Sequence, residues 1–253
     1  MLSGVPAASN LSTGAAGPAQ LLDRFLAASA RQRRSLLPEL LRRRCELGGA
    51  ILERLDSLDA TSDDWAAGTL IQLVCGADDP AAATALRARY PQGWLAVASG
   101  VGIDYGPLQQ ALILEAIEAA DRLTSEHLRQ LAGPAAVARG YVYYSEVSAM
   151  AAADLESLDR LWVCYSRGRF GFSVQGRLLQ ACDGRWERLW PRLGWKQAGL
   201  WTRYPGSFTW SHEAPEGHMP LVNQLRGVRL MDALLQHPGV RQRIEAGQGR
   251  SAR

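Results

Sequence analysis

The feature that most constrains the fold is a series of apolar stripes with helical spacing, separated by glycine, proline and small polar residues. Apolar residues three and four positions apart share one face of an α-helix, whereas a half-buried β-strand alternates. No alternating pattern is present before residue 140, and the first stripe consists of Leu21, Leu22, Phe25 and Leu26. We therefore expect an all-α fold that begins with an N-terminal helical bundle.

Capping and breaking residues predict where the helices begin and end. Ser35 is a candidate N-cap for a long helix up to about residue 58, and Ser62 is one for the next helix. Asp154 and Ser173 are candidate N-caps in the second half. The other expected elements are helices over 80–90 and from Pro107 onward, a break at Thr124–Ser125, an ordered loop over 139–149 and a last helix over about 221–236.

Length and composition are those of an ordinary globular protein. The chain has 253 residues, of which 47% are hydrophobic and 21% charged, so its core needs no disulfide or metal. The four cysteines are far apart and the four histidines form no metal-binding motif, which predicts no metal site and a reducing compartment. We find no membrane-spanning run and no secretory signal, and we expect residues 1–18 to be a disordered tail.

Charge is divided unevenly along the chain. Residues 1–159 carry 13 Arg and 19 Asp or Glu, a net charge of −6. Residues 160–253 carry 15 Arg or Lys and 6 Asp or Glu, a net charge of +9. A basic body favours an anionic partner. Both nucleic acid and a small ligand with carboxylates meet that condition, and charge alone leaves the choice open.

Aromatic residues concentrate in the basic part of the chain. Six of the eight tryptophans lie within residues 162–210. Any single one of them is more often a core residue than a ligand contact. Trp201, Phe208 and Trp210, however, occupy a stretch without helical or alternating spacing, and a long aromatic loop in a compact domain is typical of a binding site.

Arg226 and Arg229 are the second group of candidate binding residues, because residues three apart on a helix lie on one side. Most helix arginines are solvated, but beside an aromatic loop a guanidinium can bind a carboxylate through two hydrogen bonds. His212 and His218 are less favoured as ligands of a metal or macrocycle than as ordinary loop histidines. No nucleophile–base pair, carboxylate pair or phosphate loop is visible, which argues against an enzyme.

The run SRGRFGFSVQGRLL, residues 166–179, combines arginines with two closely spaced phenylalanines. We expect Phe170 and Phe172 to anchor a turn in the core and the glycine between them to permit a tight backbone. The two arginines before and after the first glycine are expected at the surface. Direct contact of Phe172 or Val174 with a ligand is the less favoured alternative.

The second half of the sequence resembles a known family, the genomes-uncoupled-4 family of tetrapyrrole-binding proteins. The resemblance covers about residues 108–236 and is strongest in DLESLDRLWVCYSRGRFGFSVQ, LGWKQAGLWTRYPGSFTW and APEGHMP. The segment AADRLTS, residues 119–125, is similar to the family's Ala-Asp-x-x-Thr element. One departure is Ile117, where the family often has tryptophan.

The resemblance implies an all-helical core shaped like a cupped hand that binds protoporphyrin IX or its magnesium complex, and in some members a linear bilin. It implies a non-enzymatic regulator that stimulates magnesium chelatase, through the large porphyrin-binding subunit, in chlorophyll synthesis. A flat apolar macrocycle with two propionates suits aromatic and arginine side chains. The family's ligand contacts would fall near Trp201, Phe208, Trp210, Leu225, Arg226 and Arg229.

Together these patterns predict a tail over 1–18, an N-terminal helical bundle over 19–104, a tetrapyrrole-binding core with long aromatic loops over 105–240, and a tail over 241–253. We expect a cytoplasmic cyanobacterial protein, or a plastid protein in a eukaryote, and leave peripheral thylakoid association open. Two alternatives remain: a bilin- or porphyrin-binding sensor without chelatase coupling, and an enzyme acting on these ligands. A nucleic-acid partner is not expected.

Overall fold

The computed structural model describes residues 17–222 and 228–251. These residues are almost entirely helical, with one antiparallel pair of two-residue strands, β1 (Lys196–Gln197) and β2 (Leu200–Trp201), which confirms the all-α prediction. The helices in chain order are α1 (Pro18–Ala27), α2 (Ala30–Arg42), α3 (Arg44–Leu55), α4 (Trp65–Gly76), α5 (Pro80–Arg89), α6 (Gly106–Ile113), α7 (Ile117–Leu131), α8 (Pro134–Arg139), the 3₁₀ helix η1 (Tyr144–Ala149), α9 (Ala152–Tyr165), α10 (Phe172–Gln180), α11 (Trp186–Arg192), α12 (Val228–Gln236) and α13 (Pro238–Ser251).

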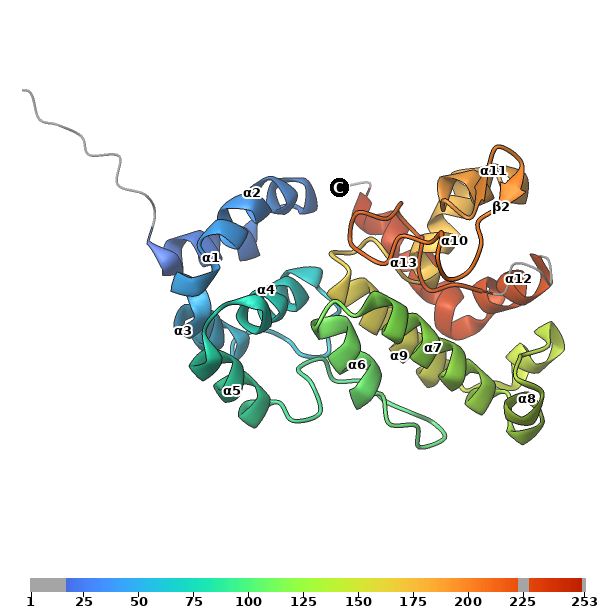
Figure 1. The fold of residues 1–253 in the computed structure, drawn as a ribbon, viewed down its shortest axis with the longest axis horizontal. Coiled ribbons are helices and arrows are strands. Elements are labelled where there is room, and N and C mark those ends of the chain that lie inside the picture. Colours follow the sequence, from blue (N-terminus) through green and yellow to red (C-terminus); the bar gives the residue numbers. More distant parts are fainter. Residues whose placement is uncertain (1–16, 223–227, 252–253) are drawn as a thin grey trace, which may run out of the picture.

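The first five helices lie at one end of the molecule and α8 and α10 to α13 at the other, with α6, α7 and α9 between them (Figure 1). One hydrophobic cluster nevertheless extends from Leu21 in α1 to Ile244 in α13. The bundle predicted for 19–104 and the core predicted for 105–240 therefore share buried surface. Their division into two domains stays a prediction.

Helix α4 is buried and links the first helices to the rest of the fold through its contacts with α3 and α9. Residues 65–74 are all buried, and α4 packs against α3 and α9. A Cβ atom on Gly68 would lie 2.2 Å from the carbonyl oxygen of Cys164, so only glycine permits this approach to α9. The Gln72 amide donates hydrogen bonds to the backbone oxygens of Leu112 and Tyr165, at 3.0 and 2.7 Å.

Two buried carboxylates, Asp154 and Asp159, fix the loops around α9, and Asp154 is not the N-cap expected from the sequence, because Ala151 occupies the N-cap position of this helix. Asp154 accepts hydrogen bonds from the Ser99 hydroxyl, the Gly100 amide and the Tyr105 hydroxyl. Asp159 accepts from the Ser173 amide and the Arg243 guanidinium. Both are fully buried, and a buried charge is tolerated only when it is paired in this way.

The predicted helix over 35–58 is wrong in two respects. It starts earlier, at α2, where the Ser29 side chain accepts from the Gln32 amide, and it is divided into α2 and α3 at Arg43. Helix α4 likewise starts after Asp64, which accepts from the Ala66 amide, and not after Ser62. Ser and Asp occur at several neighbouring positions, and their composition alone does not indicate which one caps the helix.

Three predictions in the second half also need correction. Helix α7 continues through the expected break, because the Thr124 hydroxyl donates to the Ala120 oxygen inside the helix and accepts from the Trp162 indole. The loop expected over 139–149 contains the 3₁₀ helix η1. Helix α10 begins at Phe172 with Gly171 as its cap, so Ser173 lies within the first turn.

The run 166–179 matches its expected role in part. Phe170 and Phe172 are fully buried, and Gly171 has a φ of 128°. A Cβ atom there would lie 2.7 Å from an Asp159 oxygen, which explains the glycine. Arg167 and Arg169 are not surface residues as predicted. Both are half-buried, Arg167 beside Glu115 and Arg169 as a donor to the Ala214 backbone oxygen.

The ends of the chain differ in how far they test the predicted tails. The tail predicted over 1–18 falls almost entirely outside the described residues, and Pro18 already begins α1. The C-terminal tail predicted from residue 241 is wrong, since α13 runs to Ser251 and buries Val240 and Ile244 against the core. Within the described ranges, no helix has the length and apolarity needed to cross a bilayer.

Candidate ligand-binding site

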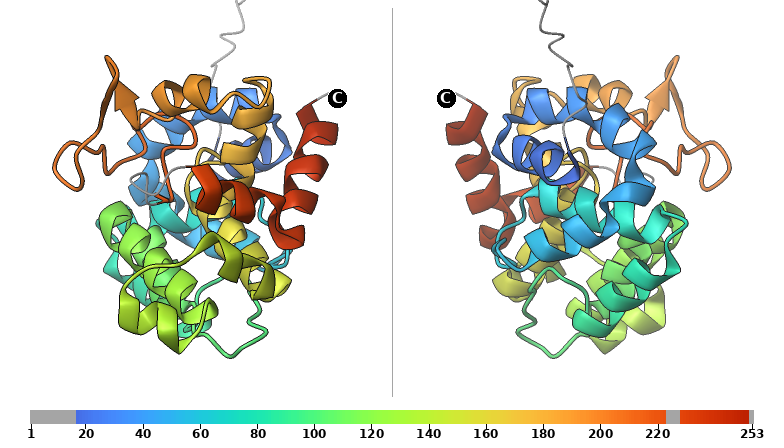
Figure 2. Two further views of the ribbon diagram at one scale, coloured as in Figure 1. Left: turned by 90° about the vertical axis from the view of Figure 1, so that its right-hand side faces the viewer. Right: turned by 90° about the vertical axis from the view of Figure 1, so that its left-hand side faces the viewer.

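A cavity of about 660 Å³ lies between α7 and the long segment that follows α11. Figure 2 shows this segment, in orange, projecting from the helical body with its two short strands. The volume is within the range of roughly 300–1,000 Å³ that is usual for organic ligands. The cavity is lined by Asp121, Arg122, Ser125, Arg129, Trp201, Thr202, Arg203, Tyr204, Phe208, Leu221 and Val222.

Helix α7 supplies the polar wall of the cavity. Asp121, Ser125 and Arg129 are four residues apart and therefore lie on one face of the helix, with Arg122 beside them. The adjoining face carries Ile117, Ala120, Thr124 and Leu128 into the core, and the buried Asp121 lies at the border between the two faces. The amphipathic pattern of α7 thus fixes which side chains are presented to the cavity.

Asp121 connects the two walls. Its Oδ1 atom accepts a hydrogen bond from the Leu221 backbone amide at 2.6 Å, although the two residues are 100 positions apart in the chain. The carboxyl is 2% exposed, and burial raises its pKa to about 7, against the smaller opposing effect of the Leu221 hydrogen bond. The bond holds Leu221 and Val222 at the cavity wall.

The facing wall is aromatic. Tyr204, Phe208 and Trp210 contact one another, with ring centroids 5.9 to 6.3 Å apart. Phe208 and Tyr204 line the cavity, whereas Trp210 lies outside the lining, where its indole donates to the Pro205 oxygen. Of the predicted aromatic contacts, the structure therefore places Phe208 at the cavity and Trp210 as its support.

Trp201, the third predicted aromatic, also lines the cavity. Its ring lies 5.6 Å from that of Trp190, and the Lys196 ammonium lies 5.3 Å from its centroid. Trp190 in turn stacks on Trp186 and Trp195. Trp201 is 37% exposed. Its indole therefore packs against aromatic neighbours on one side, while part of its surface remains accessible to a ligand.

His218 and His212 do not contribute to the cavity lining. His218 is buried, its Nδ1 lies 2.5 Å from the Leu193 oxygen and its Nε2 accepts from the Thr209 amide. Burial lowers the pKa of His218, which favours the neutral ring that this pattern needs. His212 stacks on Phe170 beside Glu115. No group of possible metal ligands occurs in the part of the chain that is described.

The cavity has a cationic rim. Arg122, Arg129 and Arg203 line it, and no ion pair involving any of them is found among the described residues. Arg229 does not line it; its guanidinium lies 5.4 Å from the ring centroid of Tyr144 in η1. Leu225 and Arg226 lie outside the described residues, in the segment that follows the cavity-lining Val222.

The site residues that sequence reasoning missed are mainly those of α7. Asp121, Arg122 and Ser125 belong to AADRLTS, a segment that resembles a family element but whose pattern predicts no role in binding. Their helical spacing indicates that they share a face. Nothing local indicates that this face meets residues 201–222, because the contact depends on chain segments about 100 positions apart.

The comparisons with known proteins agree with this architecture. The GUN4-like family matches residues 98–238, more than half of the chain. This chain belongs to the GUN4-like family. The match includes α7, the aromatic wall and α12, so every described residue that lines the cavity lies within it.

Relatives and solved structures support the assignment. A Ycf53-like protein of Synechocystis sp. is 44% identical over 68% of this chain and 74% of its own length. The tetrapyrrole-binding protein of Arabidopsis thaliana chloroplasts is 36% identical, but the match spans only about half of it, 53%. The structure of GUN4 from Chlamydomonas reinhardtii aligns with a TM-score of 0.55 at 35% identity, over 58% of this chain and 93% of that one.

Proposed function

We propose that this protein binds a tetrapyrrole in the cavity between α7 and residues 201–222, and that it regulates magnesium chelatase without being an enzyme itself. The observation that carries the proposal is a cavity of about 660 Å³ with an aromatic wall and three arginines that have no ion pair among the described residues. Membership of the GUN4-like family and the name of the Arabidopsis relative support the ligand class. The chelatase role rests on the family resemblance.

The two walls suit the two parts of a porphyrin. Trp201 and Phe208 offer apolar surface to the flat macrocycle, and burial of apolar area is worth roughly 25 cal/mol per Å². Arg122, Arg129 and Arg203 can donate to the propionates from the rim. Protoporphyrin IX and its magnesium complex are the ligands we propose first, with a linear bilin as the alternative.

We retain the other predicted contacts as part of the proposal. Trp210 would act by supporting Phe208. Leu225 and Arg226 come three and four positions after Val222 in the chain, so we propose that they border the same cavity. Arg229 is exposed beside Tyr144, and we propose that it contributes a second cationic group near the start of α12.

Titration with protoporphyrin IX tests the ligand directly. We expect saturable tryptophan quenching and a shift of the Soret band at micromolar ligand, because Trp201 lines the cavity. A dimethyl ester of the same porphyrin should bind more weakly, since it lacks the charged groups that the arginines recognise. The absence of saturable binding would contradict the proposal.

Two variants separate the proposed cationic groups. Replacement of Arg122, Arg129 and Arg203 by glutamine, and separately of Arg226 and Arg229 by alanine, should each weaken binding of the free diacid by roughly 1.5–3 kcal/mol per lost charged hydrogen bond. Binding of the diester should change much less. Equal losses for both ligands would exclude a role in propionate recognition.

The regulatory role needs its own measurement. Added to a magnesium chelatase assay with limiting protoporphyrin IX, the protein should increase the rate of magnesium insertion in proportion to its porphyrin occupancy. Porphyrin binding without any effect on the rate would favour a sensor that lacks chelatase coupling. Consumption of the porphyrin without the chelatase would instead indicate an enzyme.

A further inference from the structure

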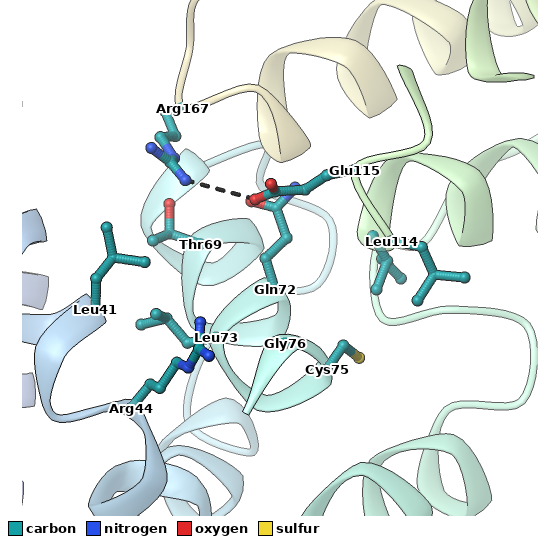
Figure 3. Close-up of a pocket in the computed structure, with 11 residues that line it drawn as sticks. Leu41, Arg44, Thr69, Gln72, Leu73, Cys75, Gly76, Leu114, Glu115 and Arg167 are labelled. Carbon is teal, nitrogen blue, oxygen red and sulfur yellow. Dashed lines mark hydrogen bonds and ion pairs between the residues drawn. The ribbon is translucent and has the colours of Figure 1, made fainter. Parts of the chain in front are cut away.

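A second cavity, of about 210 Å³, opens where the first helices meet the rest of the fold. Its walls come from the end of α2, the start of α3, one face of α4, the turn between α6 and α7, and Arg167 after α9 (Figure 3). It shares no lining residue with the cavity described above. Its lining residues are Leu41, Arg44, Thr69, Gln72, Leu73, Cys75, Gly76, Ile113, Leu114, Glu115 and Arg167.

Two buried polar atoms of this lining have no hydrogen-bond partner among the described residues. The Gln72 side-chain nitrogen donates to two backbone oxygens, which leaves the Gln72 Oε1 acceptor unused. The Arg167 Nε donor is also unused. An unsatisfied buried group costs on the order of 1–3 kcal/mol, so a hydroxyl that accepts from one and donates to the other would relieve both.

Two helix ends position the side chains of Glu115 and Arg167 beside the cavity. Glu115 and Arg167 both have left-handed conformations, with φ of 55° and 59°, although neither is glycine. Their side chains meet across the cavity, with 3.5 Å between the guanidinium nitrogen and the carboxylate oxygen. Each residue follows the C-cap of a helix, α6 or α9, and backbone bonds from Ala116 N to Ala111 O and from Gly168 N to Val163 O close the two helix ends. The two helix ends therefore bring these side chains together.

The positive charge of Arg44, on the side of the cavity away from Arg167, indicates that a ligand would place an anionic group there. Figure 3 shows Arg44 at the far side of the lining from Arg167, with Leu73 between them. The Arg167 charge is balanced by Glu115, whereas Arg44 has no acidic partner within the described ranges. Leu41, Leu73 and Leu114 supply apolar surface along the cavity.

We propose that this cavity binds a small hydroxycarboxylic acid. Its carboxylate binds Arg44, its hydroxyl lies between Gln72 Oε1 and Arg167 Nε, and its carbon skeleton packs on the leucines. The space exceeds that of a cavity of about 150 Å³ that holds benzene, so a ligand with one ring fits. The site shares no lining residue with the proposed tetrapyrrole cavity.

Calorimetric titration with 4-hydroxybenzoate tests the proposal, with benzoate and methyl 4-hydroxybenzoate as controls that lack the hydroxyl or the charge. We expect saturable binding of the hydroxy acid with a dissociation constant below about 10 mM, and dissociation constants at least tenfold higher for each control. The absence of binding, or equal binding of all three compounds, would overturn the proposal.

The Arg44→Gln variant should weaken 4-hydroxybenzoate binding about 10- to 100-fold, as expected for a charge-assisted hydrogen bond. The matched control is Arg42→Gln, which removes the same charge from an exposed position outside the lining. Arg42→Gln should leave the affinity unchanged. Equal effects of the two variants would show attraction by general charge only and would contradict a built site.

Cysteine alkylation locates the bound probe. Cys75 is partly buried in the lining, whereas Cys45 is exposed nearby and serves as an internal control. We expect saturating 4-hydroxybenzoate to slow modification of Cys75 by N-ethylmaleimide at least threefold while Cys45 reacts at its original rate. Binding that leaves the relative rates of the two thiols unchanged would place the probe elsewhere and overturn the assignment.

Discussion

The buried seam around α9, formed by Asp154, Asp159 and their hydrogen-bond partners, differs from the cavity beside α7 in whether its charged side chains are paired. At the seam, Asp154 and Asp159 are fully buried and each has several partners. At the cavity, three arginines have no ionic partner in the described part of the chain and Trp201 keeps exposed surface. At the seam the charged groups bind other groups of the protein, whereas at the cavity they remain available to bind a ligand.

The largest effect in this comparison is expected at the seam. Asp159→Ala removes a fully buried carboxylate, which takes away the acceptor of the Ser173 amide and leaves Arg243 with Asp63 as its remaining ion-pair partner. Loss of a partner from a buried ion pair costs roughly 3–5 kcal/mol of unfolding free energy. Chemical denaturation measures it. Asp232→Ala, at an exposed position of α12, is the control and should change stability little. Similar losses for both would refute the contrast.

The next effect depends on pH. The pKa of Asp121 is raised by burial to about 7 in the folded protein, above its unfolded value. The folded state therefore keeps a proton that the unfolded state releases, and stability falls as pH rises through the folded pKa. Asp121→Asn lacks this dependence, while its side-chain oxygen can still accept from the Leu221 amide.

The unfolding free energy of Asp121→Asn, relative to that of the wild type, should rise by roughly 2–4 kcal/mol as the pH is raised from about 4.5 to 8. Urea denaturation measures this difference. The exposed Asp232→Asn serves as the control and should show no such trend. A constant difference between Asp121→Asn and the wild type across this range would contradict the assignment of a buried, protonated carboxyl.

The smallest stability change is expected at Trp201. Because this residue is 37% exposed, Trp201→Leu should cost only about 1 kcal/mol of stability, far less than the same change at the buried Trp195. Protoporphyrin affinity should nevertheless fall about tenfold, through loss of aromatic contact. Fluorescence titration measures the affinity, and a large stability loss without a change in affinity would assign Trp201 to the core instead.

Periodicity predicted the helical class because it reflects local geometry. The stripe of Leu21, Leu22 and Phe25 became the buried face of α1, and Gly171 serves the tight turn expected of it. Helix boundaries were less predictable, as the early start of α2 at Ser29 shows. Several residues near each boundary have the chemistry of a cap, and the tertiary packing selects among them.

The aromatic half of the cavity could be predicted from composition, but its α7 half could not. Trp201 and Phe208 stand out in a segment without regular spacing. Arg122 and Arg129 look like ordinary solvated helix residues, and only the bond from Leu221 to Asp121 brings their face to the aromatic wall. No local pattern encodes a contact across 100 residues.

The most direct test of the cavity as the tetrapyrrole site is the dissociation constant of protoporphyrin IX for a variant with Arg122, Arg129 and Arg203 all changed to glutamine. The control variant changes the exposed Arg185 and Arg192 near α11, which do not line the cavity. Our account predicts at least a tenfold loss of affinity for the first variant and less than a threefold change for the control. Equal affinities of the two variants would contradict it.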